Sequence, residues 1–237
     1  MDIQNSIKTL AESPGTDYFG IADLSGARDF IFRQGGPEIA KYPAGVVMGI
    51  VLNDTLVELL PDREKNGNSI LYKHHAYDVV NAALDQIAMR VANTLQREGY
   101  SALPVAASRR TDDARICGPF SHKLAAHRAG LGWIGKSCLL ITPDHGPRVR
   151  WVTVLTDAPL APTGSPMETR CGNCTECVTA CPVQAFTGRL FDENEPREAR
   201  FDAAACDLFF KDEEKRTGVA VCGMCLWACP FGRVKRK

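Results

Sequence analysis

The sequence has no long hydrophobic run and no excess of charge of either sign. No apolar stretch among its 237 residues approaches the length of a membrane span. Lys and Arg total 28, as do Asp and Glu, so no overall field attracts nucleic acid. The start, Met1 to Leu10, lacks the basic and apolar parts of a secretory signal. We therefore expect a soluble cytoplasmic protein with reduced thiols and no membrane partner. The one basic concentration, Arg233 to Lys237, is expected to be a solvated end.

Cysteine, in contrast, is abundant. Eight of the ten cysteines form two runs near the C-terminus, and each run ends in Cys-Pro: Cys171, Cys174, Cys177 and Cys181, then Cys206 with Cys222, Cys225 and Cys229. The first run has the C-x2-C-x2-C-x3-C-P spacing, in which three thiolates bind one 4Fe–4S cluster and the fourth binds its neighbour. The spacing predicts a first cysteine group of Cys171, Cys174, Cys177 and Cys229, and a second cysteine group of Cys181, Cys206, Cys222 and Cys225. Each group is expected to hold one 4Fe–4S cluster, so the protein is expected to handle electrons.

Disulfides and structural zinc are the two alternative uses of these cysteines. A disulfide framework would need an oxidising compartment, which the N-terminus does not indicate. Structural zinc is the stronger alternative, because C-x2-C pairs also form zinc knuckles. The prolines after both last cysteines favour the ferredoxin pattern. Cys117 and Cys138 stand apart and are expected to be small buried hydrophobic residues.

The residues before the cysteine runs show an α+β pattern. Apolar residues at helical spacing predict helices over Ile3 to Ala11 and over Ser69 to about Glu98, the second ending at Gly99. Short apolar runs predict buried strands at 18–22, 44–52 and 101–106.

Further along, a strand at 138–142 is expected to form a hairpin with a strand at 148–155, across the turn Pro143 to Gly146. The proline-rich stretch Asp157 to Pro166 predicts a boundary between a main domain, 1–165, and a smaller domain, 166–237, that the clusters stabilise.

The segment Gly130 to Gly135 matches G-x-G-x-x-G, the dinucleotide-binding fingerprint. That motif acts between a strand and the helix that follows it. Here the order is reversed, because a helix over Ser121 to Ala129, with Ser121 as its N-cap, comes first. Two interpretations remain: a tight helix-to-strand turn with Trp133 in the core, or a loop that approaches a large ligand, with Lys136 as a cation.

The segments Lys123 to Lys136 (K-x-A-A-x-x-A-G-L-G-W-I-G-K) and Cys171 to Pro182 together resemble epoxyqueuosine reductase and its wider family of cobalamin-dependent iron–sulfur proteins. The resemblance implies a nitroreductase-like, corrinoid-binding α/β domain followed by a ferredoxin-like domain, and an oxidoreductase whose clusters pass electrons to cobalt. The cobalamin contacts implied in this way are Gly130, Gly132, Trp133, Gly135 and Lys136. The sequence has no D-x-H-x-x-G motif, so a base-off corrinoid is expected, with flavin as the alternative cofactor.

Two departures from that family bear on the substrate. Its queuosine-forming enzymes carry an aspartate, proposed as proton donor, where alignment on Gly118 places Ile116. They also continue into a helical-repeat extension associated with tRNA, which this sequence lacks. A small organic substrate is therefore expected rather than tRNA, with electrons supplied by a low-potential donor protein. Asp113, Cys117 and His122 are the candidate proton donors in place of the aspartate. The alternative function is an electron-transfer protein that serves a partner without substrate chemistry of its own.

Overall fold

The structure is a computed structural model that describes residues 2–13 and 15–233. Most of the basic C-terminal segment, 234–237, lies outside the described residues. The chain forms two compact units: Met1–Val51, Val80–Gly132 and Arg150–Met167 make up the first unit, and Leu52–Val79, Trp133–Val149 and Glu168–Lys237 make up the second. The second unit thus contains nearly all of the predicted domain 166–237, together with two segments from the predicted main domain. The boundary between domains 1–165 and 166–237 stays a prediction.

A four-stranded sheet forms the centre of the first unit, in the order β1-β2-β6-β3. Its strands are β1 (Tyr18–Asp23), β2 (Ala44–Val51), β3 (Ala102–Val105) and β6 (Val149–Thr156). β1 pairs antiparallel with β2, and β3 pairs antiparallel with β6. The two central strands, β2 and β6, are almost wholly buried, as expected for strands that have a neighbour on each side. The three strands predicted at 18–22, 44–52 and 101–106 are confirmed.

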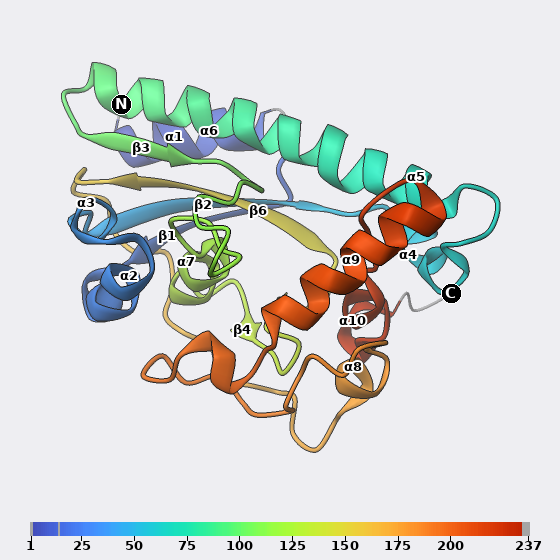
Figure 1. The fold of residues 1–237 in the computed structure, drawn as a ribbon. Coiled ribbons are helices and arrows are strands. Elements are labelled where there is room, and N and C mark those ends of the chain that lie inside the picture. The colour runs from blue at the N-terminus through green and yellow to red at the C-terminus, as the bar shows by residue number, and fades with distance from the viewer. Residues whose placement is uncertain (1, 14, 234–237) are drawn as a thin grey trace. The chain divides into compact units, whose positions relative to one another are not determined.

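Helices cover both faces of this sheet. α1 (Ile3–Glu12) and α6 (Val80–Arg97) pack together on one face, and α7 (His122–Arg128) packs against β1 and β2 on the other (Figure 1). The predicted first helix is confirmed, and Asp2 caps it by accepting a hydrogen bond from the backbone of Gln4. The shorter helices α2 (Arg28–Gly35) and α3 (Pro37–Ala40), which follow β1, were not predicted.

The predicted long helix at 69–98 is present in three consecutive parts. α5 (Asn68–Lys73) leads into a π-helix, η3 (His74–Val79), and then into α6. Gly99, with φ of +89°, ends the helix as predicted. A π turn within an α-helix is unusual and inserts one residue into the helical repeat. Strict helical periodicity gave no sign of it.

The predicted hairpin of 138–142 with 148–155 is wrong. β5 (Leu140–Ile141) pairs instead with β4 (Trp133–Ile134), while β6 pairs with β3 and occupies a central position in the sheet. The reason is burial: nearly all side chains of β6 are buried, on both faces of the strand. This pattern suits a central strand of a covered sheet better than one arm of a surface hairpin. Only the turn itself is found, as a bridge between Thr142 and Gly146.

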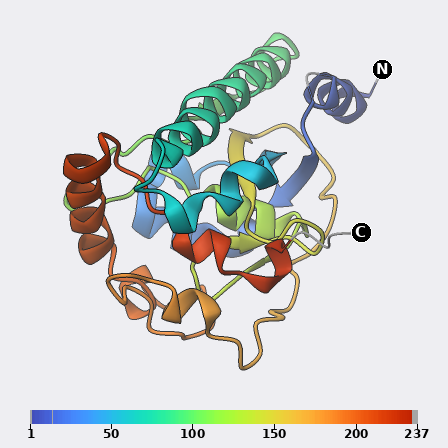
Figure 2. The same ribbon diagram turned by 90° about the vertical axis from the view of Figure 1, so that its right-hand side faces the viewer.

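Short helices dominate the second unit. Besides α5 and the β4–β5 pair it contains α4 (Asp54–Glu58), α8 (Glu176–Thr179), α9 (Ala203–Thr217) and α10 (Met224–Trp227). α8 and α10 lie side by side in both views (Figures 1 and 2). α10 also packs against the 3₁₀ turn η2 (Leu60–Asp62). In the described part of the chain, no helix has the length and apolar character needed to cross a bilayer.

Candidate metal centre

The first cysteine group surrounds one pocket. Cys171 and Cys174 come from a turn closed by a 2.9 Å hydrogen bond between the Cys174 N–H and the Cys171 carbonyl. Cys177 comes from α8, and Cys229 follows α10. All four cysteines line the pocket, and the other lining residues are Gly135, Lys136, Ser137, Ile141, Pro230 and Phe231. The fold therefore brings Cys229 to three cysteines that are distant in sequence, as the crossover prediction requires.

The second cysteine group also lies together. Cys181 is buried in a small apolar cluster against which Cys206 and Cys225 pack. Cys222 is close enough to Cys181 and Cys225 for these thiols to influence one another electrostatically. Cys177 of the first group influences the Cys225 thiol electrostatically as well. The two cysteine groups are therefore neighbours, as electron transfer between two clusters requires.

Burial makes these thiols hard to ionise in the absence of a cation. Desolvation, and then the neighbouring cysteines of its group, raises the pKa of Cys177 to about 11. Desolvation likewise raises the pKa of Cys222, Cys225 and Cys229, although backbone amides next to Cys222 and Cys229 act in the opposite direction. Metal ligation needs thiolates. Bound iron would supply the positive charge that the buried sulfur atoms lack.

The four thiols of the first cysteine group line one pocket. Among residues 2–13 and 15–233, no group of three His, Cys, Asp or Glu side chains stands in an arrangement that would hold a single metal ion. All ten cysteines are free of disulfides. Ligation by the eight predicted cysteines fits this arrangement and stays a prediction.

The start of the predicted cofactor loop is a helix-to-strand turn. α7 precedes Gly130 and β4 follows it, which confirms the reversed order that argued against a dinucleotide site. Gly130 has φ of +76°, and a Cβ there would lie 3.0 Å from backbone atoms of Ser165. Nδ1 of the buried His127 lies 3.1 Å from the carbonyl oxygen of Gly132. Protein atoms therefore occupy the space beside Gly130.

The end of this loop belongs to the second unit and lies at the first cysteine group. Trp133 is 1% exposed, its ring packs edge-to-face on Phe231 at 4.8 Å, and the guanidinium of Arg170 lies 5.4 Å from its centroid. A Cβ on Gly135 would lie 2.8 Å from Ile141 and 3.4 Å from the Cys171 sulfur. These contacts support the interpretation of Trp133 as a core residue. The five predicted cobalamin contacts stay a prediction.

His122 is tied into the first unit by both ring nitrogens. Nε2 lies 3.1 Å from the carbonyl oxygen of Ala106, and Nδ1 lies 3.0 Å from Oγ1 of Thr153. A carbonyl only accepts, so Nε2 carries the proton and Nδ1 accepts from the threonine hydroxyl. Desolvation lowers the pKa of His122 to about 4. At neutral pH His122 is uncharged and its one N–H is engaged, so the geometry gives no support to its predicted role as proton donor.

The other two candidate donors lie in and around a tight loop. Asp112 and Cys117 form a bridge in which each backbone N–H donates to the other's carbonyl, at 3.2 and 3.1 Å. Asp113 is exposed and Cys117 is half-buried. Ile116, between them, has φ of +51°, which is rare for a β-branched residue. The structure does not gather Asp113, Cys117 and His122 into one catalytic arrangement by any contact it records.

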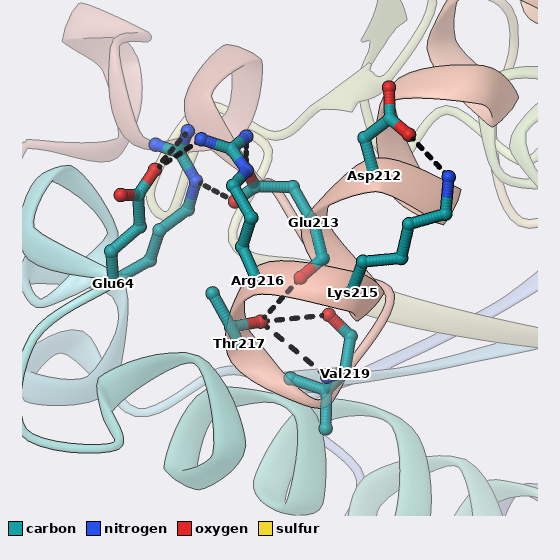
Figure 3. Close-up of polar contacts among 8 residues, drawn as sticks. Glu64, Asp212, Glu213, Lys215, Arg216, Thr217 and Val219 are labelled. Carbon is teal, nitrogen blue, oxygen red and sulfur yellow. Dashed lines mark hydrogen bonds and ion pairs between the residues drawn. The ribbon is translucent and has the colours of Figure 1, made fainter.

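A buried charge network that no sequence motif predicts lies beside the second cysteine group. Glu213 on α9 is fully buried and forms ion pairs with Arg63 and Arg216, and Arg216 also reaches Glu64 at 3.0 Å (Figure 3). The positive charge of Arg63 acts on the Cys222 thiol to lower its pKa, and the charge of Glu213 acts to raise it. Neither residue stands in a motif.

A second buried network holds segments of the second unit together. Arg148 is 1% exposed and donates to Asp54 at 2.8 Å and to Glu58 at 2.6 Å. The other oxygen of Glu58 accepts from the indole N–H of Trp227, at 3.1 Å. Trp227 is the last residue of α10, which carries Cys225. These contacts fix the helix that lies between Cys222 and Cys229.

Comparison with known proteins agrees with this geometry. Residues 170–232 match the family described as a 4Fe-4S double cluster binding domain. The chain is 31% identical to epoxyqueuosine reductase of Listeria monocytogenes over 156 residues, which cover 60% of this chain and 38% of that protein. It is 30% identical to epoxyqueuosine reductase of Vibrio cholerae serotype O1 over 276 residues, which cover 98% of this chain and 69% of that protein. The chain belongs to the epoxyqueuosine reductase family.

The fold of this family member extends to another group of enzymes. A catabolic reductive dehalogenase matches it with a TM-score of 0.68 and 24% identity, over 97% of this chain and 32% of that chain. The predicted family and the α+β fold with a 4Fe–4S double cluster domain are therefore confirmed. The match to the Listeria protein spans well under half of that protein's length, so the chain corresponds to only part of it.

Proposed function

We propose that this chain is an oxidoreductase that takes electrons from a low-potential donor protein and passes them through two 4Fe–4S clusters toward a substrate. The observation that carries the proposal is the pocket at which Cys229 joins Cys171, Cys174 and Cys177. The second cysteine group packs next to the first through Cys225. When bound, the clusters would store and release single electrons.

The protein's own residues would set the environment of each cluster. Burial of Cys181, Cys222 and Cys229 excludes water from the sulfur atoms. The backbone N–H of Ala185 donates to the sulfur of Cys181 at 3.3 Å. Such hydrogen bonds, together with burial and nearby charge, tune the potentials of iron–sulfur centres. The absence of disulfides supports a reducing compartment, and we propose the cytoplasm.

The first test is the metal content and its dependence on Cys229. We expect close to eight iron and eight sulfide per chain in anaerobic preparations, and about four of each in Cys229→Ala, because two cubanes require these numbers. The matched variant Cys222→Ala should instead lose the other cluster, as seen by EPR. Stoichiometric zinc without iron would refute the proposal. Loss of the same cluster in both variants would refute the crossover between the runs.

A corrinoid in base-off form is the proposed acceptor of the electrons, with flavin as the alternative. The resemblance of the segment Lys123 to Lys136 to the family motif supports this. In the structure, a Cβ on Gly130 would meet Ser165 and a Cβ on Gly135 would meet Ile141, while the Lys136 ammonium donates to backbone carbonyls, so these three residues already have contacts within the protein. The test is the visible spectrum of the anaerobic protein after cobalamin is added, where base-off binding predicts a shift and an unchanged spectrum would contradict it.

The proposed substrate is a small organic molecule rather than an epoxyqueuosine-containing tRNA. An isoleucine cannot donate a proton, and a positioned acid typically contributes 10²- to 10⁴-fold to such a step. Ile116 stands where the family's aspartate is expected. We expect the unmodified protein to turn over epoxyqueuosine-containing tRNA poorly and Ile116→Asp to turn it over faster. Robust turnover by the unmodified protein would overturn this proposal.

One observation favours a second function, electron delivery to a partner protein without substrate chemistry. The half-buried His122 has both nitrogens occupied and Asp113 is exposed, so neither is held ready to donate a proton inside a site. Variants of the candidate proton donors distinguish the two functions. Electron transfer to an artificial acceptor should survive Cys117→Ala and Asp113→Asn under both, whereas reduction of a small substrate should fall only if the chain itself carries the chemistry.

A further inference from the structure

The charge of Lys136, at the end of the Gly130 to Lys136 loop, is directed at the first cysteine group. The Lys136 ammonium donates hydrogen bonds to the carbonyl oxygens of Gly172, at 2.8 Å, and Cys174, at 3.1 Å. Both carbonyls belong to the turn that presents Cys171 and Cys174. Lys136 also lines the pocket that the four cysteines surround. All of these residues lie within the second unit.

The charge of this ammonium is not cancelled locally. No ion pair is recorded between Lys136 and any carboxylate in the part of the chain that the structure describes, and the side chain is half-buried. Its hydrogen-bond partners are neutral carbonyls. The charge beside the second cysteine group is different, because Arg63 there is paired with the buried Glu213. Lys136 therefore contributes a net positive charge at the first pocket.

We propose that Lys136 is a positioning and charge-tuning residue of the first 4Fe–4S cluster. Its two hydrogen bonds fix the turn from Cys171 to Cys174, and its charge makes that cluster easier to reduce. Each reduction adds one electron, taken from the donor protein, and so one unit of negative charge to the cluster. A nearby cation stabilises the reduced form more than the oxidised form. This inference rests on the proposed ligand sets and goes beyond them by assigning the lysine to the cluster.

The size of the effect follows from Coulomb's law. A unit charge at a separation on the order of 10 Å, with an effective dielectric constant of about 20, changes an equilibrium by roughly tenfold. In Lys136→Gln we therefore expect a roughly tenfold lower ratio of reduced to oxidised first cluster at a given potential, or a shift of ~59 mV to more negative values for one electron. The second cluster should shift much less.

The experiment is a potentiometric EPR titration of the full chain with both clusters bound. The signal of the first cluster is the one that disappears in Cys229→Ala. Lys136→Gln should keep close to eight iron and shift that signal, while Lys136→Arg, which keeps the charge, should titrate near the unmodified protein. Lys215→Gln is the matched control, because it removes an exposed ammonium that pairs with Asp212.

The outcomes separate this inference from the proposed function. An unmodified protein without about eight iron would mean that the proposed function fails. Full iron in Lys136→Gln with both midpoints unchanged would overturn the inference alone. Loss of about four iron from Lys136→Gln would contradict the expected retention and overturn the charge-tuning part of the inference, leaving the lysine as a residue that only holds the turn. An unchanged first midpoint with lost cobalamin binding would show instead that Lys136 serves the corrinoid.

Discussion

The buried ion network of Arg148 offers a test of how the second unit is held together. Its guanidinium is 1% exposed, whereas its partners Asp54 and Glu58 are 49% and 43% exposed. Removing the arginine charge, or removing both carboxylate charges, breaks the same two ion pairs, but the charge that remains differs. Arg148→Met leaves two carboxylates that water can solvate. The pair of changes Asp54→Asn and Glu58→Gln leaves a positive charge buried without a counter-charge.

The expected costs follow from that asymmetry. Removing one partner of a buried ion pair costs about 3–5 kcal/mol when it leaves an uncompensated buried charge. We expect this cost for Asp54→Asn with Glu58→Gln. For Arg148→Met we expect about 1–2 kcal/mol, because the remaining charges are half-exposed and methionine fills part of the space. For a chain of this size each kcal/mol shifts the melting temperature by about 2–4 °C. The triple variant should recover much of the loss, since it buries no charge.

The assay is the thermal loss of the visible cluster absorption under anaerobic conditions, with far-UV circular dichroism recorded in parallel. Asp212→Asn, which breaks an exposed pair with Lys215, serves as the control and should cost under about 1 kcal/mol. A larger loss in Arg148→Met than in the double carboxylate variant would refute the reasoning. It would mean that packing around the arginine stem, and not the buried charge, dominates.

Three further predictions concern Gly135, the half-buried His122 and the strained Ile116. Gly135→Val should lose about half of the iron, because its new side chain would collide with Ile141 and crowd the first pocket; iron analysis beside EPR checks this. The folded protein holds His122 neutral with a pKa of about 4, against 6.5 for an ordinary histidine, so the unfolded chain binds the proton first. Stability should therefore be full above pH 6.5 and fall by up to about 3 kcal/mol as the pH drops from 6.5 to 4, and unfolding titrations of His122→Gln should show a flatter profile. At Ile116, the positive φ should make the glycine variant more stable than the alanine variant by about 1 kcal/mol, the reverse of the usual order, and equal melting temperatures would argue against strain there.

The grouping of the cysteines was predictable because ligand spacing reflects the geometry of the cluster more than that of the fold. Cys229 reaches Cys177 and its neighbours as the spacing indicated. The α7 helix was predictable for a similar local reason, since Ser121 caps it by accepting from the backbone of Leu124. In both cases the deciding interactions involve few residues in fixed patterns.

Other features depend on long-range pairing, which a single sequence does not reveal. From the sequence, β6 could pair with the segment before Pro147 or join a larger sheet. It joins the sheet, where both of its faces are buried. Arg63 finds Glu213 across 150 residues of sequence, and no motif announces either partner. Lys136 was predicted to be a cation that contacts a large ligand, which stays a prediction, and its hydrogen bonds to Gly172 and Cys174 could not be inferred from its place in the loop.

The second unit is interleaved with the first along the chain, and this limits how far its cysteine-rich part is a portable module. Residues 170–232 match a family of their own, which suggests a segment that could be exchanged between proteins as one unit. In this chain, however, Glu213 pairs with Arg63, Trp227 donates to Glu58, and the Gly172 carbonyl accepts from Lys136, and all three partners lie outside residues 170–232. A transplant of that segment would leave Glu213 buried without Arg63 and the turn at Gly172 without its cation. Exchange of cluster domains between relatives would have to carry the segments 52–79 and 133–149 along with it.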